Sequence, residues 1–291
     1  MPELPEVETI INGLRTKVRN RTFVDIWTDW PKIVKKPGSF GVFKKDIIGR
    51  KIQRIWRRGK NILFDLSGGR ILLVHQKMTG HLLLGEWKMI KNGWKSEIQG
   101  PLSDDPRNGF LHVIFFLNDG VQLALSDMRK FAKIELWRKK ELEKSDGLNS
   151  LGPEPLDKSF TSEKFKKVLP QKGKIKQVLM NQNIIAGIGN IYSDEILWEA
   201  RIHPLRNVAD LSGKDLKEIY VAIKKILEKA IRLKGDSMSD FRLVNGEKGG
   251  YQEIQNVYRR EGMPCFRKDG GIIKRIKIGG RSAHFCPICQ K

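Results

Sequence analysis

The chain opens with Met-Pro-Glu-Leu-Pro-Glu-Val-Glu-Thr (residues 1–9), a stretch that sets up a helix at the start of the sequence. The apolar residues in and after it repeat at helical spacing: Val7, Ile10, Ile11, Leu14 and Val18. Acidic residues stand in the first turn and basic residues in the last, as is typical of an α-helix that begins near Pro5. The stretch therefore predicts an amphipathic helix that fixes the N-terminus against a core.

The same residues also carry a candidate nucleophile. Removal of Met1 would leave Pro2 with a free secondary amine, and an α-amino group of pKa about 7.7–8.0 is unprotonated in roughly one molecule in seven near pH 7. Such an amine can attack a carbon at the aldehyde oxidation level, and Glu3 is placed to move the accompanying proton. An ordinary helix start has the same residue types, because Pro5 and Glu6 are both favoured in a first helical turn.

The composition indicates a polyanionic partner. The chain has 291 residues, with 55 Lys and Arg against 33 Asp and Glu, which gives a formal net charge of +22. This charge suits a nucleic acid, although a solvated basic surface or binding to anionic lipid would have the same composition. No apolar run is long enough to cross a membrane, and the N-terminus lacks the basic and apolar regions of a signal peptide. We therefore expect a cytoplasmic protein.

Length and apolar content allow two folded domains, since the chain exceeds the usual size of one and 40% of its residues are apolar. Residues 22–138 predict mainly strands, at 47–55, 61–66, 70–74, 111–117, 121–125 and 133–137, separated by turns such as Ser67-Gly68-Gly69. A β-sandwich or flattened barrel is the expected product. The polar stretch 87–109 predicts a long surface loop with no assigned chemistry.

The second half of the chain changes to helical periodicity. Charges, Gly, Ser and two prolines around residues 139–158 predict an interdomain linker. Helices are expected at 165–169, 175–180, 193–200, 211–216 and 217–233, followed by a Gly/Ser/Asp-rich segment at 235–250 and a basic, hairpin-like tail. All three cysteines follow residue 260, and in a reducing compartment this clustering indicates a metal site rather than a disulfide framework.

Several blocks resemble one protein family, in that family's order along the chain. Residues 1–9 are similar to the N-terminus of the bacterial formamidopyrimidine-DNA glycosylases, which belong to a wider group with endonuclease VIII. The further matching blocks are His75-Gln-Lys-Met78, Asp127-Met-Arg129-Lys-Phe131, Leu151-Gly-Pro-Glu-Pro155, Gly187-Ile-Gly-Asn190-Ile-Tyr192, His203-Pro204 and the C-terminal cysteine segment. Because the blocks extend along nearly the whole chain, the resemblance is far more specific than one motif.

The resemblance implies an α+β fold in four parts. These are an N-terminal catalytic β-sandwich with the N-terminal helix (residues 1–138), an interdomain linker (139–158), a helix-two-turn-helix DNA-binding domain with a lesion-recognition loop (159–250), and a degenerate zinc-finger hairpin (251–291). It implies a bifunctional DNA glycosylase and AP lyase that excises oxidised purines, such as 8-oxoguanine and formamidopyrimidines, in base excision repair. The implied partner is duplex DNA with oxidised or abasic sites, bound by a nucleoid-associated monomer that has no membrane partner.

The resemblance also assigns roles to single residues. Pro2 would attack C1′ of the flipped nucleotide with Glu3 moving protons, and Lys60, after Arg57-Arg58-Gly59, matches the family's catalytic lysine. The implied DNA-binding residues are His75, Met78, Arg129, Phe131, Asn190 and Arg281. His75 could serve as a proton carrier or as a donor to phosphate, since its unperturbed pKa is near 6.5. Met78, Arg129 and Phe131 would fill the void left by the extruded base.

Three positions in these blocks depart from the family pattern or leave their role open. Met128 stands where relatives often have a small residue or proline, and Ala132 replaces the usual glycine, which puts the local turn in doubt. Asn190 follows a Gly-x-Gly turn whose backbone N–H groups could grip a phosphate at a helix N-terminus. Ordinary packing of such a turn would give the same sequence.

The C-terminal segment 258–291, called the finger below, departs most. Cys286-Pro-Ile-Cys289 is intact, but the first Cys-x-x-Cys pair has become Cys265-Phe-Arg-Lys268, with one extra residue before the second pair. Asp269 is a candidate fourth zinc ligand beside Cys265, Cys286 and Cys289. Alternatively the finger is metal-free and held by apolar residues of its hairpin, Ile272, Ile276, Ile278 and Phe285. We expect weak zinc or none, while nine Lys and Arg against two acids, with Arg281 among them, favour a retained DNA role.

Two rival functions remain at this stage. An endonuclease VIII-like enzyme would prefer oxidised pyrimidines, but that group typically has glycine where this chain has Leu4. A non-catalytic DNA-damage-binding protein could keep the same fold, and the presence of Pro2, Glu3 and Lys60 argues against it.

Overall fold

The computed structural model describes residues 1–91 and 93–291, which divide into two compact units. The first unit contains Met1–Asn149 and Leu233–Gln252, and the second contains Ser150–Arg232 and Glu253–Lys291. The chain thus leaves the first unit, builds most of the second, and comes back before ending in the second. We call Leu233–Gln252 the return segment.

Two sheets form the first unit. The four-stranded sheet has the order β1 (Phe23–Thr28), β9 (Leu111–Leu117), β10 (Gln122–Ser126), β6 (His81–Gly85). The five-stranded sheet has the order β2 (Val34–Lys36), β11 (Lys133–Arg138), β5 (Arg70–His75), β4 (Asn61–Leu66), β3 (Ile52–Arg58). Neighbouring strands are antiparallel except β2 and β11, which are parallel.

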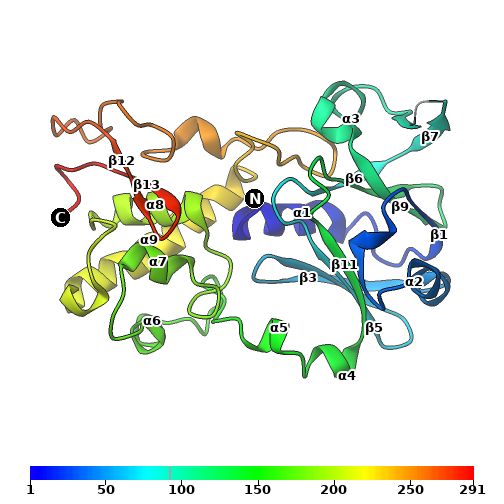
Figure 1. Ribbon diagram of the computed structural model, residues 1–291, viewed down its shortest axis with the longest axis horizontal. Helices are drawn as coiled ribbons and strands as arrows, with labels where there is room; N and C mark the ends of the chain where they lie inside the picture. Colours follow the sequence, from blue (N-terminus) through cyan, green and yellow to red (C-terminus); the bar gives the residue numbers. More distant parts are fainter. Residues whose placement is uncertain (92) are drawn as a thin grey trace. The chain divides into compact units, whose positions relative to one another are not determined.

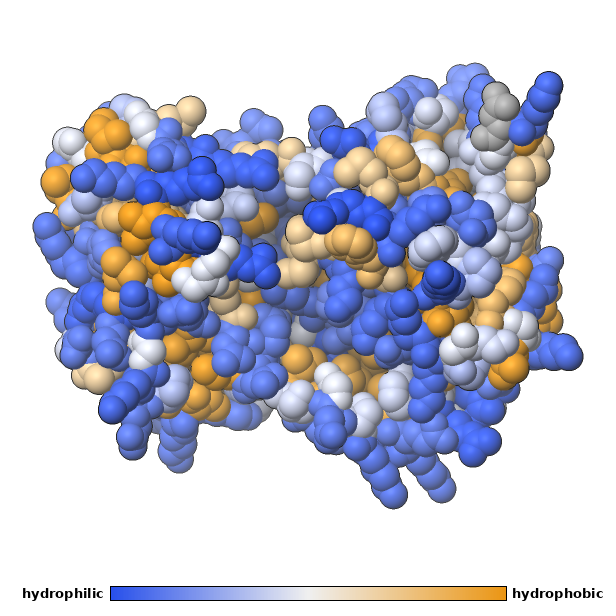
Figure 2. Space-filling view, viewed as in Figure 1, coloured by the Kyte–Doolittle hydropathy of each residue, from blue (hydrophilic) through white to orange (hydrophobic). Residues whose placement is uncertain are grey.

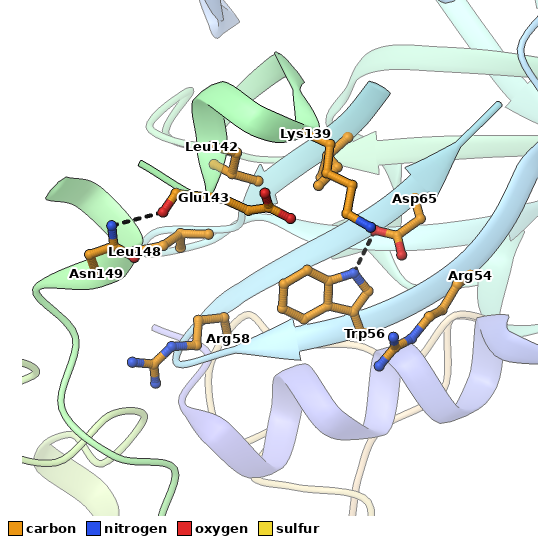
Figure 3. A pocket seen from close by; sticks show the side chains of 10 residues that line it. Arg54, Trp56, Arg58, Asp65, Lys139, Leu142, Glu143, Leu148 and Asn149 are labelled. Atoms are coloured by element: carbon orange, nitrogen blue, oxygen red, sulfur yellow. Dashed lines mark hydrogen bonds between the residues drawn. The ribbon is translucent and has the colours of Figure 1, made fainter. Parts of the chain in front are cut away.

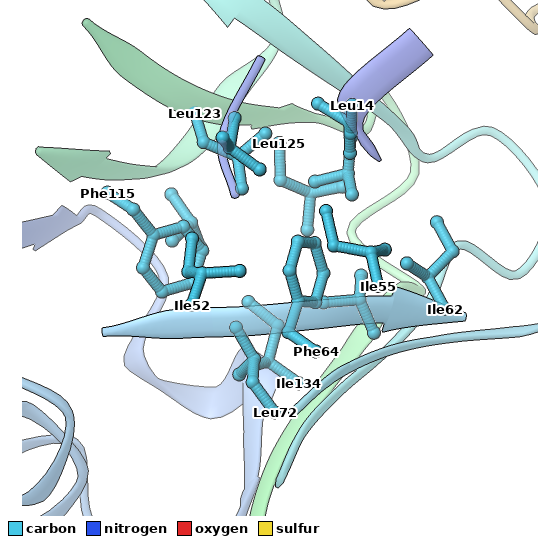
Figure 4. Close-up of a cluster of buried hydrophobic side chains, with 14 of the residues drawn as sticks. Leu14, Ile52, Ile55, Ile62, Phe64, Leu72, Phe115, Leu123, Leu125 and Ile134 are labelled. Atoms are coloured by element: carbon cyan, nitrogen blue, oxygen red, sulfur yellow. The ribbon is translucent and has the colours of Figure 1, made fainter. Parts of the chain in front are cut away.

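The main core lies where both sheets and helix α1 (Leu4–Arg15) bring their apolar faces together. Phe64 of β4, Phe115 of β9 and Leu14 of α1 belong to one buried cluster, which Figure 4 shows from close by. Side chains alternate along β4, so Leu63 joins a separate cluster on the opposite face of the five-stranded sheet. Truncating a core phenylalanine such as Phe64 to alanine costs about 3–5 kcal/mol. The predicted β-sandwich with an N-terminal helix is confirmed.

Shorter elements complete this unit. They are η1 (Pro31–Ile33), α2 (Phe40–Ile47), β7 (Trp87–Ile90), β8 (Gly93–Ser96), α3 (Pro101–Asp104), η2 (Pro106–Gly109), α4 (Lys139–Leu142) and α5 (Asp146–Asn149).

Two expectations for this unit were wrong. Residues 47–55 are not one strand, because Ile47 ends α2 and a turn with Gly49 at φ +79° precedes β3. Residues 87–109 are not a loop but contain the β7–β8 hairpin, α3 and η2, and they bury Trp87 and Leu102. The wide spacing of the apolar residues among polar ones hid this small core from a reading of periodicity.

The second unit is helical and ends in a hairpin. Its elements are α6 (Ser162–Val168), α7 (Ile175–Met180), α8 (Asn190–Glu199), η3 (Val208–Asp210), α9 (Gly213–Arg232), β12 (Lys274–Ile278) and β13 (Arg281–Phe285), while η4 (Tyr251–Ile254) lies where the chain re-enters this unit. Figure 1 shows α7, α8 and α9 grouped with the β12–β13 hairpin. One helix, α9, replaces the two expected at 211–216 and 217–233, because no breaker interrupts its apolar face after Gly213.

The return segment differs from the expected division of the chain, which grouped residues up to 250 with the helical domain. Leu84 N of β6 donates to Val244 O at 2.7 Å, and Phe241, Leu243 and Val244 join the main core of the first unit. The apolar run at 241–244 therefore fills the sandwich rather than extending the helices. The expected linker at 139–158 likewise contains α4 and α5 of the first unit before the change of unit at Ser150.

Hydrophilic residues cover most of the molecular face in Figure 2, in keeping with the net charge of +22. Among residues 1–91 and 93–291, every helix is too short or too polar to span a bilayer.

Candidate active site, nucleic-acid interface and metal centre

Glu6 joins the first residues of the chain to the return segment. Its Oε2 accepts from Glu3 N at 2.8 Å, and its Oε1 accepts from Asp236 N at 2.8 Å. Glu3 and Glu6 are 2% and 1% exposed, and Pro2 is buried. The helix start therefore holds Pro2 and Glu3 in one place, next to residues 235–250, which correspond by the family resemblance to the lesion-recognition loop.

Gly235 shows how closely these parts approach. Its φ is +77°, and a Cβ there would lie 2.7 Å from Glu6 Oε1, so any side chain would push the return segment away. Glu6 is a site residue that the sequence analysis missed. Its position three residues after Glu3 signals a capping box, but the sequence gives no sign of the second bond to Asp236.

Lys60 lies in the turn between β3 and β4 and is 7% exposed. Arg57 braces this turn: its Nε donates to Glu8 Oε2 of α1 at 2.9 Å, and its Nη1 donates to Gly59 O at 3.1 Å. The ion pair therefore fixes the turn that carries Lys60 to the helix that follows Pro2. Arg57 and Glu8 are further positioning residues, and both looked like ordinary surface charges in the sequence.

His75 ends β5. Burial first, and then the positive charges of Lys77, Lys133 and Lys60, lower the pKa of His75 to about 3, so the ring is neutral at pH 7. His75 Nδ1 accepts from Lys77 N at 3.0 Å, which leaves the ring hydrogen on Nε2. Of the two roles considered for His75, this geometry favours a hydrogen-bond donor to phosphate over a proton carrier.

Two loops bring Met78, Arg129 and Phe131 into one region of the first unit. We call residues 76–80 and 127–132 the wedge loops. Arg129 N donates to Thr79 Oγ1 at 3.1 Å, so the two loops are directly bonded. The Arg129 guanidinium lies 4.6 Å from the Phe131 ring centroid, and Phe131 is 51% exposed, as a side chain that enters DNA needs to be.

Ala132 does not disturb the second wedge loop. Its N donates to Asp127 Oδ2 at 2.7 Å, and Arg129 N lies 3.3 Å from Asp127 Oδ1, so one buried carboxylate closes the turn. Lys130 takes the left-handed backbone conformation at φ +55°. The departures from the family pattern at Met128 and Ala132 are therefore compatible with an ordered loop.

The first unit also has a pocket of about 470 Å³ on the sheet face opposite the main core (Figure 3). Trp56 and Leu142 form apolar walls, and Trp56 Nε1 donates to Asp65 Oδ1 at 2.8 Å. Of the residues predicted for catalysis or DNA binding, none lines this pocket in the described part of the chain.

Asn190 begins α8 in the second unit, after a turn that Gln182 closes. Gln182 Nε2 donates to Ile188 O at 2.7 Å, and Gly187 N, at φ +93°, donates to Gln182 Oε1 at 2.9 Å. The Asn190 Oδ1 is buried and accepts no hydrogen bond from the described residues. A buried acceptor oxygen of this kind is suited to an external hydrogen-bond donor.

A buried polar chain joins α7, α8 and the finger. Lys176 Nζ donates to Asp194 Oδ1 at 2.5 Å, and Asp194 Oδ2 accepts from His284 N at 2.9 Å. Lys176 and Asp194 are wholly buried. Because α8 starts at Asn190 and β13 starts at Arg281, this chain fixes the two predicted DNA-contacting residues of the second unit relative to each other.

The hairpin turn is held in the same way. Gly279 and Gly280 have φ of +54° and +78°, and a Cβ on Gly279 would lie 2.2 Å from Gln177 Nε2 of α7. Arg281 follows at once and is exposed. One detail of the hairpin was wrong: Ile273, not Ile272, is buried, and Ile272 is 48% exposed.

The finger brings four ligand groups together. One ligand atom each from Cys265, Asp269, Cys286 and Cys289 lies within 4.8 Å of all the others. Tetrahedral zinc with Zn–S bonds of about 2.3 Å separates its ligands by about 3.8 Å. The Cys265 and Cys289 sulfurs are 4.0 Å apart, and Cys286 Sγ lies 3.5 Å from Asp269 Oδ2, so the residues present fit zinc.

The surroundings of the cluster act differently on its two kinds of ligand. A hydrogen bond from Gly271 N lowers the pKa of Asp269 and favours its carboxylate, whereas burial raises the pKa of Cys289 to about 12 and favours its thiol. Arg267 Nη1 lies 3.2 Å from Cys289 Sγ and is a positive donor for a thiolate. Lys268, which stands at the family's ligand position, is exposed, and Asp269 faces the sulfurs instead.

Comparisons with known proteins agree with this arrangement. Residues 1–134 match the formamidopyrimidine-DNA glycosylase N-terminal domain, residues 151–242 the H2TH domain of the same enzymes, and residues 270–291 the zinc finger found in FPG and IleRS. The formamidopyrimidine-DNA glycosylase of Pelotomaculum thermopropionicum is 40% identical, covering 100% of this chain and 99% of its own length. That of Heliobacterium modesticaldum is 38% identical, covering 100% of both chains.

Solved structures give the same result. A Lactococcus lactis FPG mutant in complex with a Fapy-dG containing DNA has a TM-score of 0.86 and 33% identity, with 100% of both chains covered. The Lactococcus lactis Fpg complex with an abasic site containing DNA has a TM-score of 0.84 at 33% identity, with 99% of both chains covered. Both family domains and the finger are therefore present in order along the full length, and the chain belongs to the formamidopyrimidine-DNA glycosylase family.

Proposed function

We propose that the protein excises oxidised purines from duplex DNA and cleaves the resulting abasic site, with the Pro2 nitrogen as the nucleophile. Family membership makes it a DNA glycosylase of base excision repair, and AP lyase activity is expected of the family. The observation that carries the assignment of the nucleophile is the buried helix start, in which Glu6 holds Glu3 and the return segment together. We also propose the domain division given by the sequence, except that the return segment groups with the first unit, and the cytoplasmic, nucleoid-associated location expected from the sequence.

The proposed chemistry starts after Met1 is removed, because an amide nitrogen is not nucleophilic. The lone pair of Pro2 forms a bond to C1′, and the glycosidic bond breaks. The base leaves with the electron pair of the glycosidic bond and takes up a proton. Glu3 moves the proton that accompanies opening of the sugar ring. The resulting iminium makes the C2′ proton acidic, so elimination breaks the C3′–O bond and a second elimination breaks the C5′–O bond. Neither an oxidant nor a reductant is consumed.

The remaining residues bind and position DNA in this proposal. Lys60, at the family's catalytic lysine position, binds the phosphate or the base of the damaged nucleotide, and His75 contacts its phosphate. Asn190 and Arg281 contact the DNA backbone from the second unit. Met78, Arg129 and Phe131 occupy the space left by the extruded base. The return segment, with its small residues after Gly235, presents backbone amides to the oxidised base.

The substrate class follows from the relatives. Solved relatives are complexes with Fapy-dG containing DNA and with carbocyclic 8-oxo-G containing DNA. A second candidate is excision of oxidised pyrimidines, because a Lactococcus lactis FPG structure contains oxidised pyrimidine DNA. Parallel excision assays on 8-oxoguanine and on an oxidised pyrimidine decide between them, and we expect the purine to be preferred.

Zinc has a structural role in this proposal. Cys265, Asp269, Cys286 and Cys289 would hold it, and it would cross-link the two ends of the finger. A carboxylate in place of the fourth thiolate gives a weaker site, because the softer sulfur ligand is the better match for zinc.

The decisive experiment is borohydride trapping on duplex DNA that contains 8-oxoguanine. Mature protein should form a covalent complex through Pro2, whereas Pro2→Gly and a form that retains Met1 should trap poorly. Peptide mapping of the adduct locates the nucleophile. If both altered forms trapped at the wild-type rate and the adduct mapped to Lys60, Pro2 would not be the nucleophile.

A further inference from the structure

A chain of buried polar side chains crosses the first unit from the wedge loops to the return segment. Its members are Asp127, Thr79, His81 and Asn108, each no more than 4% exposed. Buried polar groups cost free energy unless they are paired, so their partners show what this chain holds in place.

At the wedge end, Thr79 and Asp127 bind both loops. Thr79 Oγ1 donates to Asp127 Oδ1, and Arg129 N donates to Thr79 Oγ1 at 3.1 Å. Thr79 directly follows Met78, and Asp127 closes the turn that carries Phe131. Any shift of Thr79 therefore moves the wedge residues.

In the middle, the hydrogen-bond directions are fixed. Asn108 Nδ2 donates to Pro101 O at 2.7 Å and to Gly246 O at 3.1 Å, and both carbonyl oxygens can only accept. Asn108 Oδ1 must then accept from His81 Nε2, which lies 3.0 Å away. Burial lowers the pKa of His81 to about 4, so the neutral ring has one hydrogen and this contact uses it. His81 Nδ1 lies 3.3 Å from Thr79 O.

At the far end, the return segment is docked on α3 and η2. Gly246 has φ +82°, and a Cβ there would lie 2.7 Å from Asn108 Nδ2. Arg242 Nε donates to Asp105 Oδ2 at 2.5 Å, which makes a second, partly buried link between the same two parts. Because the hydrogen of His81 is on Nε2, its Nδ1 has none to give Thr79 O. The hydrogen-bonded chain therefore runs from His81 through Asn108 to Gly246, and the backbone through Gly80 joins His81 to Thr79 of the wedge loop.

We propose that His81 and Asn108 are positioning residues that couple the wedge loops to the return segment, so that base extrusion and lesion reading are set together. The proposal rests on the function given above to Met78, Phe131 and the return segment. His81 and Asn108 act through these parts, because both are buried away from any ligand surface.

The first test separates excision from lyase chemistry. His81→Leu and Asn108→Ala each orphan a buried polar group, and we expect a loss of at least about 10-fold in single-turnover excision of 8-oxoguanine from duplex DNA. Cleavage of a pre-formed abasic site should change by less than about 3-fold, since no base has to be extruded. His81→Gln should recover excision to within about 3-fold of wild type, because its amide nitrogen can donate to Asn108 in place of the ring.

The second test measures coupling directly. Phe131→Ala lowers the excision rate by some factor in wild type. In the His81→Leu background this factor should be at least about 5-fold smaller, because the wedge is already displaced. Gln122→Ala is the matched control: this amide makes two 3.0 Å bonds to the backbone of Trp87 in the same unit and touches neither loop. It should lower the thermal midpoint without a selective loss of excision.

Equal losses on both substrates, no recovery in His81→Gln, or additive effects with Phe131→Ala would each overturn the coupling. If His81→Leu does not fold, Asn108→Ala and His81→Gln carry the same comparison. Wild-type protein that neither excises nor traps would overturn the proposed function instead, so the two failures are distinct.

Discussion

Glu6 is the residue on which the geometry of the helix start depends most. It accepts one backbone N–H from Glu3 and one from Asp236, and it is buried. We expect Glu6→Ala to lower the free energy of unfolding by about 1–3 kcal/mol, because two buried donors lose their acceptor. Trapping by Pro2 should fall as well, and urea unfolding with a parallel trapping assay measures both.

A nearby substitution provides the control for Glu6. Thr9 lies in the same helix and donates to Pro5 O at 2.7 Å without contacting the return segment. Thr9→Ala should leave trapping at the wild-type rate. A Glu6→Ala protein that traps as well as Thr9→Ala would show that the bond to Asp236 has no part in positioning the nucleophile.

The pKa of His75 gives a prediction about pH. The pKa is lowered to about 3, below the unfolded value near 6.5, so the unfolded chain binds more protons between these limits. The stability that neutral His75 contributes is complete above pH 6.5 and is lost as the pH falls toward 3. His75→Gln should therefore flatten the dependence of unfolding free energy on pH in that window, as measured by urea titrations.

DNA binding supplies the functional counterpart for His75. Because the ring is neutral throughout pH 5.5–8, the affinities of wild type and His75→Gln should run parallel over that range at constant salt. If the wild-type affinity for DNA changed near pH 6.5 and the affinity of His75→Gln did not, His75 would bind phosphate as a cation.

The wedge loops act as elements, because Asp127 and Thr79 make them one bonded structure. Phe131→Ala and Met78→Ala should each slow excision from duplex DNA about 10-fold or more, while cleavage at a pre-formed abasic site stays near wild type. Phe131 is 51% exposed, so its truncation should leave the thermal midpoint within about 1 °C. Equal losses on the two substrates would indicate a packing defect.

The finger makes a prediction about metal. With Asp269 as the fourth ligand, a chelator should remove the zinc. Asp269→Ala should lower the affinity for zinc further, and Asp269→Cys should raise it. Cobalt substitution followed by absorption spectroscopy reports the number of thiolate ligands independently of enzyme activity. Ser282→Ala, on the hairpin outside the cluster, is the control. One tightly held zinc that is unchanged by Asp269→Ala would exclude the carboxylate as a ligand.

Sequence patterns identified those elements whose apolar residues repeat regularly. The helix after Pro5, the strand at 61–66 and the helix at 175–180 follow from periodicity alone. The β7–β8 hairpin did not, because half-buried Trp94 packs against Trp27 and Phe116, which are distant in sequence. Packing against residues that are distant in sequence produced no regular apolar repeat in this hairpin.

At the scale of the whole molecule, charge governs the encounter with DNA. A chain of net charge +22 that grips phosphates releases counterions, so affinity should fall steeply with salt. Arg281→Ala should weaken binding and flatten the slope of log K against log salt by about one unit. Binding isotherms between 50 and 300 mM salt measure this slope. Lys214→Ala on α9 is the comparison variant. If Arg281→Ala and Lys214→Ala gave equal slopes, Arg281 would not contact the DNA backbone.

The candidate site was only partly readable from the sequence. Pro2, Lys60 and Asn190 stand in short blocks whose residue types are distinctive. Their supports, such as Glu6 with Asp236 and Lys176 with Asp194, join residues far apart in the chain, and each partner alone is an ordinary charge. Reacting residues can therefore be predicted from short motifs in one sequence, whereas the residues that position them cannot.

The return segment also has a consequence for how the protein is made. Phe241, Leu243 and Val244 belong to the core of the first unit, but a ribosome adds them only after most of the second unit has been synthesised. During this interval the sandwich lacks part of its interior, and the N-terminal residues are not yet clamped by Asp236. We therefore expect that a peptidase can reach Met1 while the chain is still being made, before the return segment closes over the helix start that buries Pro2.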